Sequence, residues 1–156
     1  MKRLLSVILA ILLIFTLTAC NGVNELSVKE ITTHITSELD LTGFTNVKGE
    51  TLSHYFGFSS EDIKSFSFLV SEDEAKSEMI AAFEYENDDG KKLIIDGIGN
   101  YFLNKASVLK DNVTAEYEKI QSRLIYEYEN TIILVVCGDT LSARTVLEGI
   151  GATELK

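Results

Sequence analysis

The side chains that could bind a metal or transfer protons are few and widely spaced. His34 and His54 are the only histidines, and they form no zinc-binding pair such as HExxH. They could hold zinc or supply a base only if the fold brought them together. His34 lies next to Ile35 on an expected helix, which favours a histidine at the edge of the core. We therefore predict no metal site, no catalytic residue and no cofactor.

Three further patterns have the letters of a functional motif without its context. The acidic runs at 72–74 and 88–89 lack EF-hand spacing, so we interpret them as solvated turns. Ser107 and Lys110 match SxxK, the nucleophile pattern of penicillin-recognising enzymes, but SDN and KTG are absent. Residues 96–100 begin like a GxGxxG phosphate loop, but Phe102 replaces the last glycine. None of these patterns indicates a reaction.

Tyrosines are the remaining side chains that could line a binding site. Tyr101, Tyr117, Tyr126 and Tyr128 could bound a sugar or peptide groove. Tyr126 and Tyr128 are two residues apart on one expected strand and therefore share a face. They form our candidate ligand face. Ordinary packing of an amphipathic sheet is the alternative and the simpler explanation.

The N-terminal segment has the order of a secretory signal. Lys2 and Arg3 precede an apolar run over residues 4–19, which is 16 residues long and is followed by Cys20. This run is shorter than the roughly 20 residues of a helix that crosses a bilayer. We predict a signal peptide over residues 1–19 with cleavage between Ala19 and Cys20. A permanently inserted helix is the alternative.

The four residues Leu17-Thr18-Ala19-Cys20 resemble the lipobox of bacterial lipoproteins. This resemblance implies that the Cys20 thiol carries a diacylglyceryl group and that the new amino terminus can be acylated as well. Two or more chains make a stable anchor. The expected location is the outer face of the bacterial cell membrane, with residues 20–24 as lipidated cysteine and tether and 25–156 as one domain.

Charge and cysteine content narrow the partners of the expected mature chain. Residues 20–156 keep 12 of the 14 basic residues and all 24 acidic ones, a formal net charge of −12. Such a surface repels nucleic acids, so we exclude them as partners. With Cys20 lipidated, Cys137 has no disulfide partner. Because Cys137 ends an apolar run, we predict a buried, unreactive thiol.

Hydrophobic periodicity predicts an α+β domain. The expected elements are a helix through Val28, Ile31, Ile35 and Leu39, a short helix over 50–56, strands over 64–70 and 78–85, a long helix over 90–110, strands over 123–129 and 131–137, and a helix through Leu141, Val146, Leu147 and Ile150. Residues 40–48 are expected to be a break, and 114–121 a connector with at most one helical turn. We expect Gly97 and Gly99 to permit close packing of the long helix against the sheet.

Two hairpins separated by a long helix predict a four-stranded, mainly antiparallel sheet with helices on one face, in the order α-β-β-α-β-β-α.

From about residue 25 onward the chain resembles DUF4358, a family of small bacterial lipoproteins defined as a domain of unknown function. The resemblance rests on the acidic N-terminal helix, the run 77–83 before the long helix, Tyr117 and the strands near Arg123 and Thr131. It implies no activity and transfers no catalytic residue.

These observations favour a non-catalytic, lipid-anchored domain that binds a ligand or an envelope protein outside the membrane. Two alternatives stay open. A pocket that combined several of His34, His54, Asp96 and Arg123 would favour an unrecognised cell-surface enzyme. An exposed apolar patch on one sheet face would favour an accessory subunit of an envelope machine.

Overall fold

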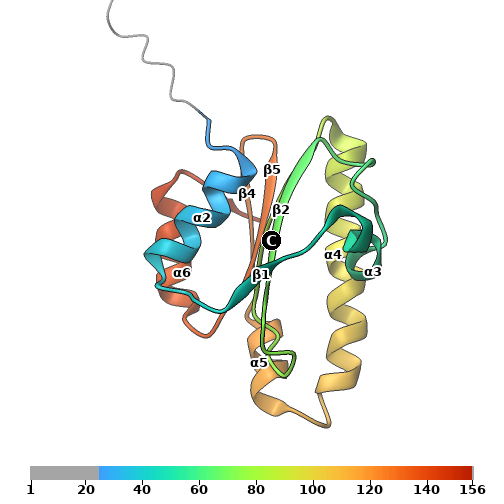
Figure 1. Ribbon diagram of the computed structural model, residues 1–156, viewed down its shortest axis with the longest axis vertical. Coiled ribbons are helices and arrows are strands. Elements are labelled where there is room, and N and C mark those ends of the chain that lie inside the picture. Colours follow the sequence, from blue (N-terminus) through green and yellow to red (C-terminus); the bar gives the residue numbers. More distant parts are fainter. Residues whose placement is uncertain (1–24, 156) are drawn as a thin grey trace, which may run out of the picture.

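Two strands of almost continuous apolar sequence lie at the centre of the computed structural model, which describes residues 25–155. β3 (Met79–Glu84) and β5 (Thr131–Val136) pair antiparallel, with Ala81 opposite Leu134. Every residue of β5 is buried, and so is every residue of β3 except Glu84. Strands that are apolar on both sides need cover on both faces of the sheet. Helices supply that cover (Figure 1).

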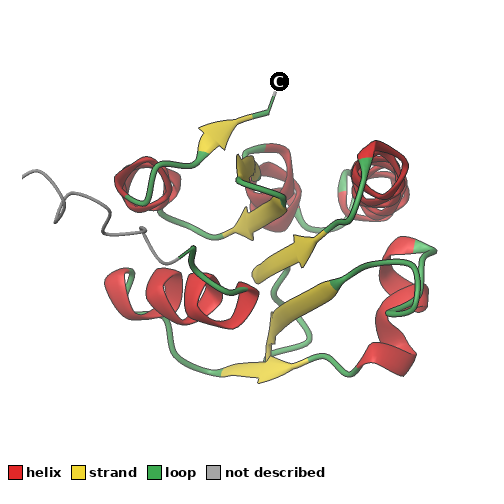
Figure 2. Ribbon diagram, turned by 90° about the horizontal axis from the view of Figure 1, so that it is seen from above, coloured by secondary structure: helices red, strands yellow, loops and turns green. Residues whose placement is uncertain are grey.

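Each face of the sheet has its own helical layer. α4 (Asp88–Leu109) and α3 (Leu52–Phe56) lie on one side, whereas α2 (Val28–Glu38) and α6 (Thr140–Gly149) lie on the other (Figures 1 and 2). The prediction of helices on one face is therefore wrong. Met79, Ala81, Phe83 and Tyr85 belong to the core on one face of the sheet, but Ile80 and Ala82 between them are equally apolar and form part of a second core on the other face.

The sheet has six strands in the order β1-β2-β3-β5-β4-β6, and every neighbouring pair is antiparallel. The remaining strands are β1 (Phe44–Asn46), β2 (Ser65–Ser71), β4 (Leu124–Tyr128) and β6 (Thr153–Glu154). The α+β class and the antiparallel pairing are confirmed, but the count of four strands is wrong. The two additional strands are the edge strands, which are too short and too exposed to show an alternating pattern.

Helix boundaries follow capping residues. The Asn87 side chain accepts a hydrogen bond from the Gly90 amide (3.0 Å) and begins α4. Asp139 does the same for α6 through the Ser142 amide (3.0 Å). After the short 3-10 turn η1 (Gly49–Thr51), α3 ends at Gly57, whose φ of 77° is a conformation that glycine adopts without strain. The predicted connector 114–121 is a complete helix, α5 (Thr114–Gln121).

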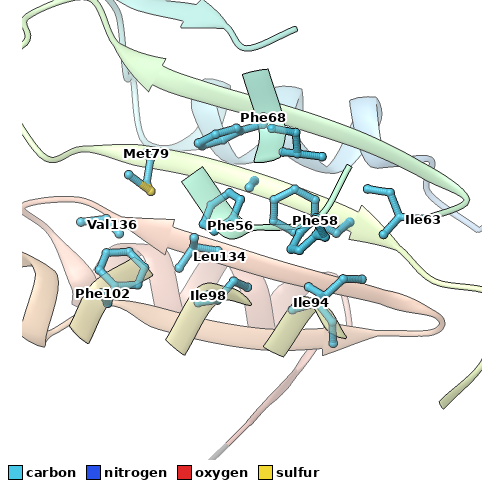
Figure 3. Close-up of a cluster of buried hydrophobic side chains, with 14 of the residues drawn as sticks. Phe56, Phe58, Ile63, Phe68, Met79, Ile94, Ile98, Phe102, Leu134 and Val136 are labelled. Atoms are coloured by element: carbon cyan, nitrogen blue, oxygen red, sulfur yellow. The ribbon is translucent and has the colours of Figure 1, made fainter. Parts of the chain in front are cut away.

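Aromatic rings fill the core beneath α3 and α4 (Figure 3). Phe56 and Phe58 both meet the Phe83 ring edge-on, at centroid distances of 5.3 and 5.6 Å. Gly97 permits this packing, because a Cβ there would lie 2.5 Å from the Phe56 carbonyl oxygen and 2.9 Å from the Phe58 ring. The predicted close approach therefore involves α3 and the chain after it rather than the sheet. Along residues 25–155, no helix combines the length and hydrophobicity needed to span a bilayer.

Candidate functional site

The polar residues that could have indicated an enzyme do not converge. His34 lies on α2 and His54 on α3, so the sheet separates them. Asp96 is exposed on α4 and forms an ion pair with Lys92 (Nζ–Oδ2, 2.6 Å). Arg123 packs its guanidinium 4.8 Å from the centre of the Phe102 ring. Within the part of the chain that the structure describes, no three His, Cys, Asp or Glu side chains are grouped to hold a metal ion.

The short motifs have local structural roles. Asp73 accepts a hydrogen bond from the Ala75 amide (3.1 Å) in the exposed turn between β2 and β3. Asp88 and Asp89 occupy the first turn of α4, where carboxylates interact favourably with the helix dipole. Ser107 donates to the Asn104 carbonyl within α4 (2.7 Å), as an ordinary helical serine does.

The candidate ligand face is part of the core. Tyr126 and Tyr128 do share a face of β4, but both are buried together with residues of α2 and α6. The Tyr126 hydroxyl accepts a hydrogen bond from Arg144 (3.1 Å), and the Tyr128 hydroxyl accepts one from the Leu26 amide (3.5 Å). The ligand role expected for these two rings stays a prediction, and their burial argues against it. A period of two identifies a shared face but does not reveal which helix covers it.

Cys137 lies at the end of β5 as a free, buried thiol with an exposure of 2%. Burial raises the pKa of this thiol, and its Sγ donates to the Asp139 carbonyl (3.4 Å). The predicted buried thiol is confirmed. The signal peptide, its cleavage point between Ala19 and Cys20 and the lipidated Cys20 lie outside the described residues.

A groove of about 640 Å³ runs between α3 and α4, a volume within the range of small-molecule sites. We call it the α3–α4 groove. Its walls are mainly apolar and aromatic, from Tyr55, Tyr101, Val108 and Leu109. Its polar groups come from Ser53, His54, Asn100, Asn104 and Lys105. Gly97 lines the groove as well, so the close approach of α3 at this glycine also shapes the site.

Lys105 is the half-buried cation of this groove. Its Nζ donates to the Tyr101 hydroxyl (3.1 Å), one helical turn earlier, and lies 5.5 Å from the centre of that ring. Burial lowers the pKa of Lys105, and the charge of Glu116 opposes this effect only in part. Burial also raises the pKa of Tyr101 to about 12, with a further contribution from neighbouring Tyr55. Tyr101 therefore keeps its proton at neutral pH.

Glu78 and Glu116, two acidic residues close to this groove, already share another lysine. Lys119 Nζ lies 2.8 Å from Glu116 Oε1 and 3.2 Å from Glu78 Oε1. The second oxygen of Glu116 accepts a hydrogen bond from the Ser77 amide (2.6 Å). Burial alone would raise the pKa of Glu116, but these hydrogen bonds lower it below its ordinary value. Glu116 is thus fully engaged, and no carboxylate of the described chain forms an ion pair with Lys105.

Tyr55, Tyr101 and Lys105 also border a second cavity of about 400 Å³, which reaches toward the β1 edge of the sheet. Its far side carries Glu72 and Glu74. Lys105 consequently lies at the junction of an apolar groove and a more polar cavity. Such a position suits a ligand with one charged end and one apolar end.

The fold and this groove define a class: an antiparallel α+β domain with helices on both faces of its sheet and a mainly apolar, ligand-sized groove on one side. The profile of a family described as "Domain of unknown function (DUF4358)" matches residues 37–137. The chain belongs to this family. No curated protein and no solved structure matches it.

Proposed function

We propose that this protein is a lipid-anchored, extracytoplasmic domain that binds a small amphipathic molecule without converting it, and that the α3–α4 groove is its binding site. The observation that carries the proposal is the groove itself. It combines a ligand-sized volume, aromatic and aliphatic walls and a small set of polar groups. The lipid anchor is supported by the resemblance of residues 17–20 to a lipobox.

The chemistry of the groove supports binding more than catalysis. Tyr101, with a pKa raised to about 12, is a hydrogen-bond donor and a poor base at neutral pH. Lys105 donates to Tyr101 and forms no ion pair with a carboxylate of the described chain, and His54, which also lines the groove, has no hydrogen bond to either side chain. Two donors side by side bind an acceptor, but they do not form the base-and-nucleophile pair that group transfer needs.

A cell-surface enzyme is the second candidate, and one observation favours it. Burial lowers the pKa of Lys105, which increases the fraction of neutral amine available to attack a carbonyl. Reduction with cyanoborohydride in the presence of 3-phenylpropanal tests this candidate. A covalent adduct on Lys105 that forms much faster than one on exposed Lys92 would favour the enzyme over the binding module.

The accessory-subunit alternative has less support. We expected an exposed apolar patch on one sheet face for such a protein. In residues 25–155, helices cover both faces of the sheet (Figure 2). Leu103 is the most exposed leucine of α4, with 73% of its surface accessible. It does not line the α3–α4 groove.

The groove is tested with a neutral probe and a matched pair of variants. The full chain in phosphatidylcholine nanodiscs is titrated with 3-phenylpropanamide, and methyl NMR signals are followed. We expect millimolar binding that shifts the Val108 and Leu109 methyls and leaves the Leu103 methyls unmoved. Val108→Asp should weaken binding at least five-fold, whereas Leu103→Asp should not, although the two side chains are similarly exposed at 64% and 73%. Shifts that map outside the groove would contradict the proposal.

A further inference from the structure

We infer that the molecule bound in the α3–α4 groove is a monocarboxylate with an apolar body, and that Lys105 and Tyr101 together bind its carboxylate. This inference rests on the proposed function, because it names the ligand class of the same groove. Both side chains have hydrogen-bonding capacity that the protein does not use.

Lys105 has donors to spare. An ammonium group has three N–H donors, and the structure gives Lys105 one partner, the Tyr101 hydroxyl. The neighbouring lysine on α5, Lys119, is by contrast held by two carboxylates. A half-buried cation without an ion-pair partner is destabilising even though the charge of Glu116 offsets part of the effect, and a ligand carboxylate would reduce that penalty on binding.

Tyr101 supplies a second donor beside the first. Its oxygen accepts the bond from Lys105, which leaves its own O–H proton free to donate. The positions 101 and 105 are one turn apart on α4, so both groups project from the same side of the helix. Two adjacent donors, one of them charged, fit the two oxygens of one carboxylate.

The surrounding charges limit the ligand to a single negative charge. Glu72, Glu74 and Glu78 border the adjoining cavity together with the exposed Lys76, and the whole chain has a formal net charge of −10. A phosphate or a dicarboxylate would bring a second negative charge into a region where three carboxylates already outnumber two lysines, Lys76 and Lys105. One half-buried cation and one neutral donor match a monoanion.

The rest of the groove specifies an apolar body. Tyr55, Val108 and Leu109 present rings and methyl groups next to Lys105. An aryl or short alkyl chain would be removed from water against these side chains, at about 25 cal/mol for each Å² of apolar surface buried. A small aryl-alkanoic or medium-chain fatty acid therefore meets both parts of the site.

Three probes of nearly equal shape test the inference: 3-phenylpropanoate, 3-phenylpropanamide and 3-phenylpropylamine. Each is titrated by calorimetry and NMR into the full chain in phosphatidylcholine nanodiscs, with empty nanodiscs as the blank. We expect the acid to bind about ten-fold more tightly than the amide, the usual scale of a charge-assisted hydrogen bond, and the amine to bind more weakly than both. This comparison needs no variant, so it does not depend on the folding of any mutant.

Variants then assign the preference to residues. Lys105→Met keeps the length of the side chain and should make acid and amide bind equally well. Tyr101→Phe should reduce the preference for the acid about three-fold. Lys92→Met, on the same helix outside the groove, is the control and should leave the preference unchanged.

The outcomes separate the two proposals. Equal binding of acid and amide to the wild-type protein, with both weakened by Val108→Asp, would overturn carboxylate recognition and leave the groove as a binding site. A ten-fold preference for the acid that survives Lys105→Met would overturn the role of Lys105. Failure of all three probes to bind at 10 mM or so, far above the Kd expected for a fragment, would overturn both proposals.

Discussion

We expect the half-buried charge of Lys105 to reduce the stability of the folded protein when the groove is empty. Because burial lowers the pKa of Lys105, the folded state binds this proton less readily than the unfolded state does. We predict that Lys105→Met raises the free energy of unfolding by about 1 kcal/mol at pH 7, or about 4 °C in Tm. Urea unfolding monitored by circular dichroism measures this difference.

The pH dependence of that difference is a separate test. Between the lowered pKa of folded Lys105 and its ordinary value of 10.5, the unfolded chain binds more protons, so wild-type stability rises with pH. Lys105→Met lacks this contribution. Its advantage should therefore shrink as the pH rises toward 10.5, while Lys92→Met shows no advantage at any pH. An advantage that grows with pH would contradict the assignment.

Cys137 should be inert in the folded protein. Its side chain is 2% exposed and burial raises its pKa, so both the access of a reagent and the thiolate fraction are low. In a Cys20→Ala background, where Cys137 is the only thiol, we predict at least 100-fold slower reaction with Ellman's reagent at pH 8 than in 8 M urea, the usual order for an inaccessible thiol. Reaction at the unfolded rate without urea would show that β5 is not protected.

The residues of the proposed binding site illustrate what a single sequence can and cannot indicate. Tyr101 was one of four tyrosines that could line a groove, and the structure places it there, whereas Tyr126 and Tyr128 are in the core. The spacing of Gly97, Tyr101 and Lys105 by four residues each puts them on one side of α4. Nothing local in the sequence indicates that α3 packs at Gly97, and that tertiary contact creates the site.

Two glycines of α4 offer a matched comparison at the scale of elements. A Cβ at position 97 would lie 2.5 Å from the Phe56 backbone oxygen, whereas a Cβ at position 99 has no atom within 4 Å. We predict that Gly97→Ala costs about 2 kcal/mol through forced separation of α3 and α4. Gly99→Ala should add about 0.5–1 kcal/mol, because alanine favours a helix. Denaturant midpoints measure both effects, and similar effects of the two variants would contradict the close contact.

The elements that sequence analysis predicted best are those with long hydrophobic periods. The inner strands β2, β3, β4 and β5 and helices α2, α4 and α6 lie where their patterns place them, with ends shifted by a few residues. The edge strands β1 and β6 have three and two residues, which is too few to establish a period of two. The sequence predicts at most one helical turn where α5 lies, because a polar helix of eight residues shows little periodicity. The faces of the sheet could not be assigned, since helix placement depends on packing that sequence spacing does not encode.

For the whole molecule, the expected anchor makes a direct prediction about location. Cys20→Ala removes the proposed site of lipid attachment and should move the protein from the membrane fraction to the soluble fraction of the cell envelope, because the acyl chains supply the binding energy. Fractionation with an alkaline wash and immunoblotting measures this change. Ser27→Ala, at the N-cap of α2 close to the tether, is the control and should remain in the membrane fraction. A Cys20→Ala protein that resists the wash would instead indicate an inserted helix.

The buried central strand also has a consequence before the protein is folded. Thr131–Val136 is six residues long and has neither a charge nor a proline, the kind of segment that assembles into cross-β aggregates when it is exposed. In the folded sheet β3 and β4 occupy both of its edges, and only Glu129 and Asp139 provide flanking charges. Destabilising variants such as Gly97→Ala should therefore be lost mainly to aggregation and proteolysis. Their abundance in the cell would then fall more steeply than their affinity for a ligand.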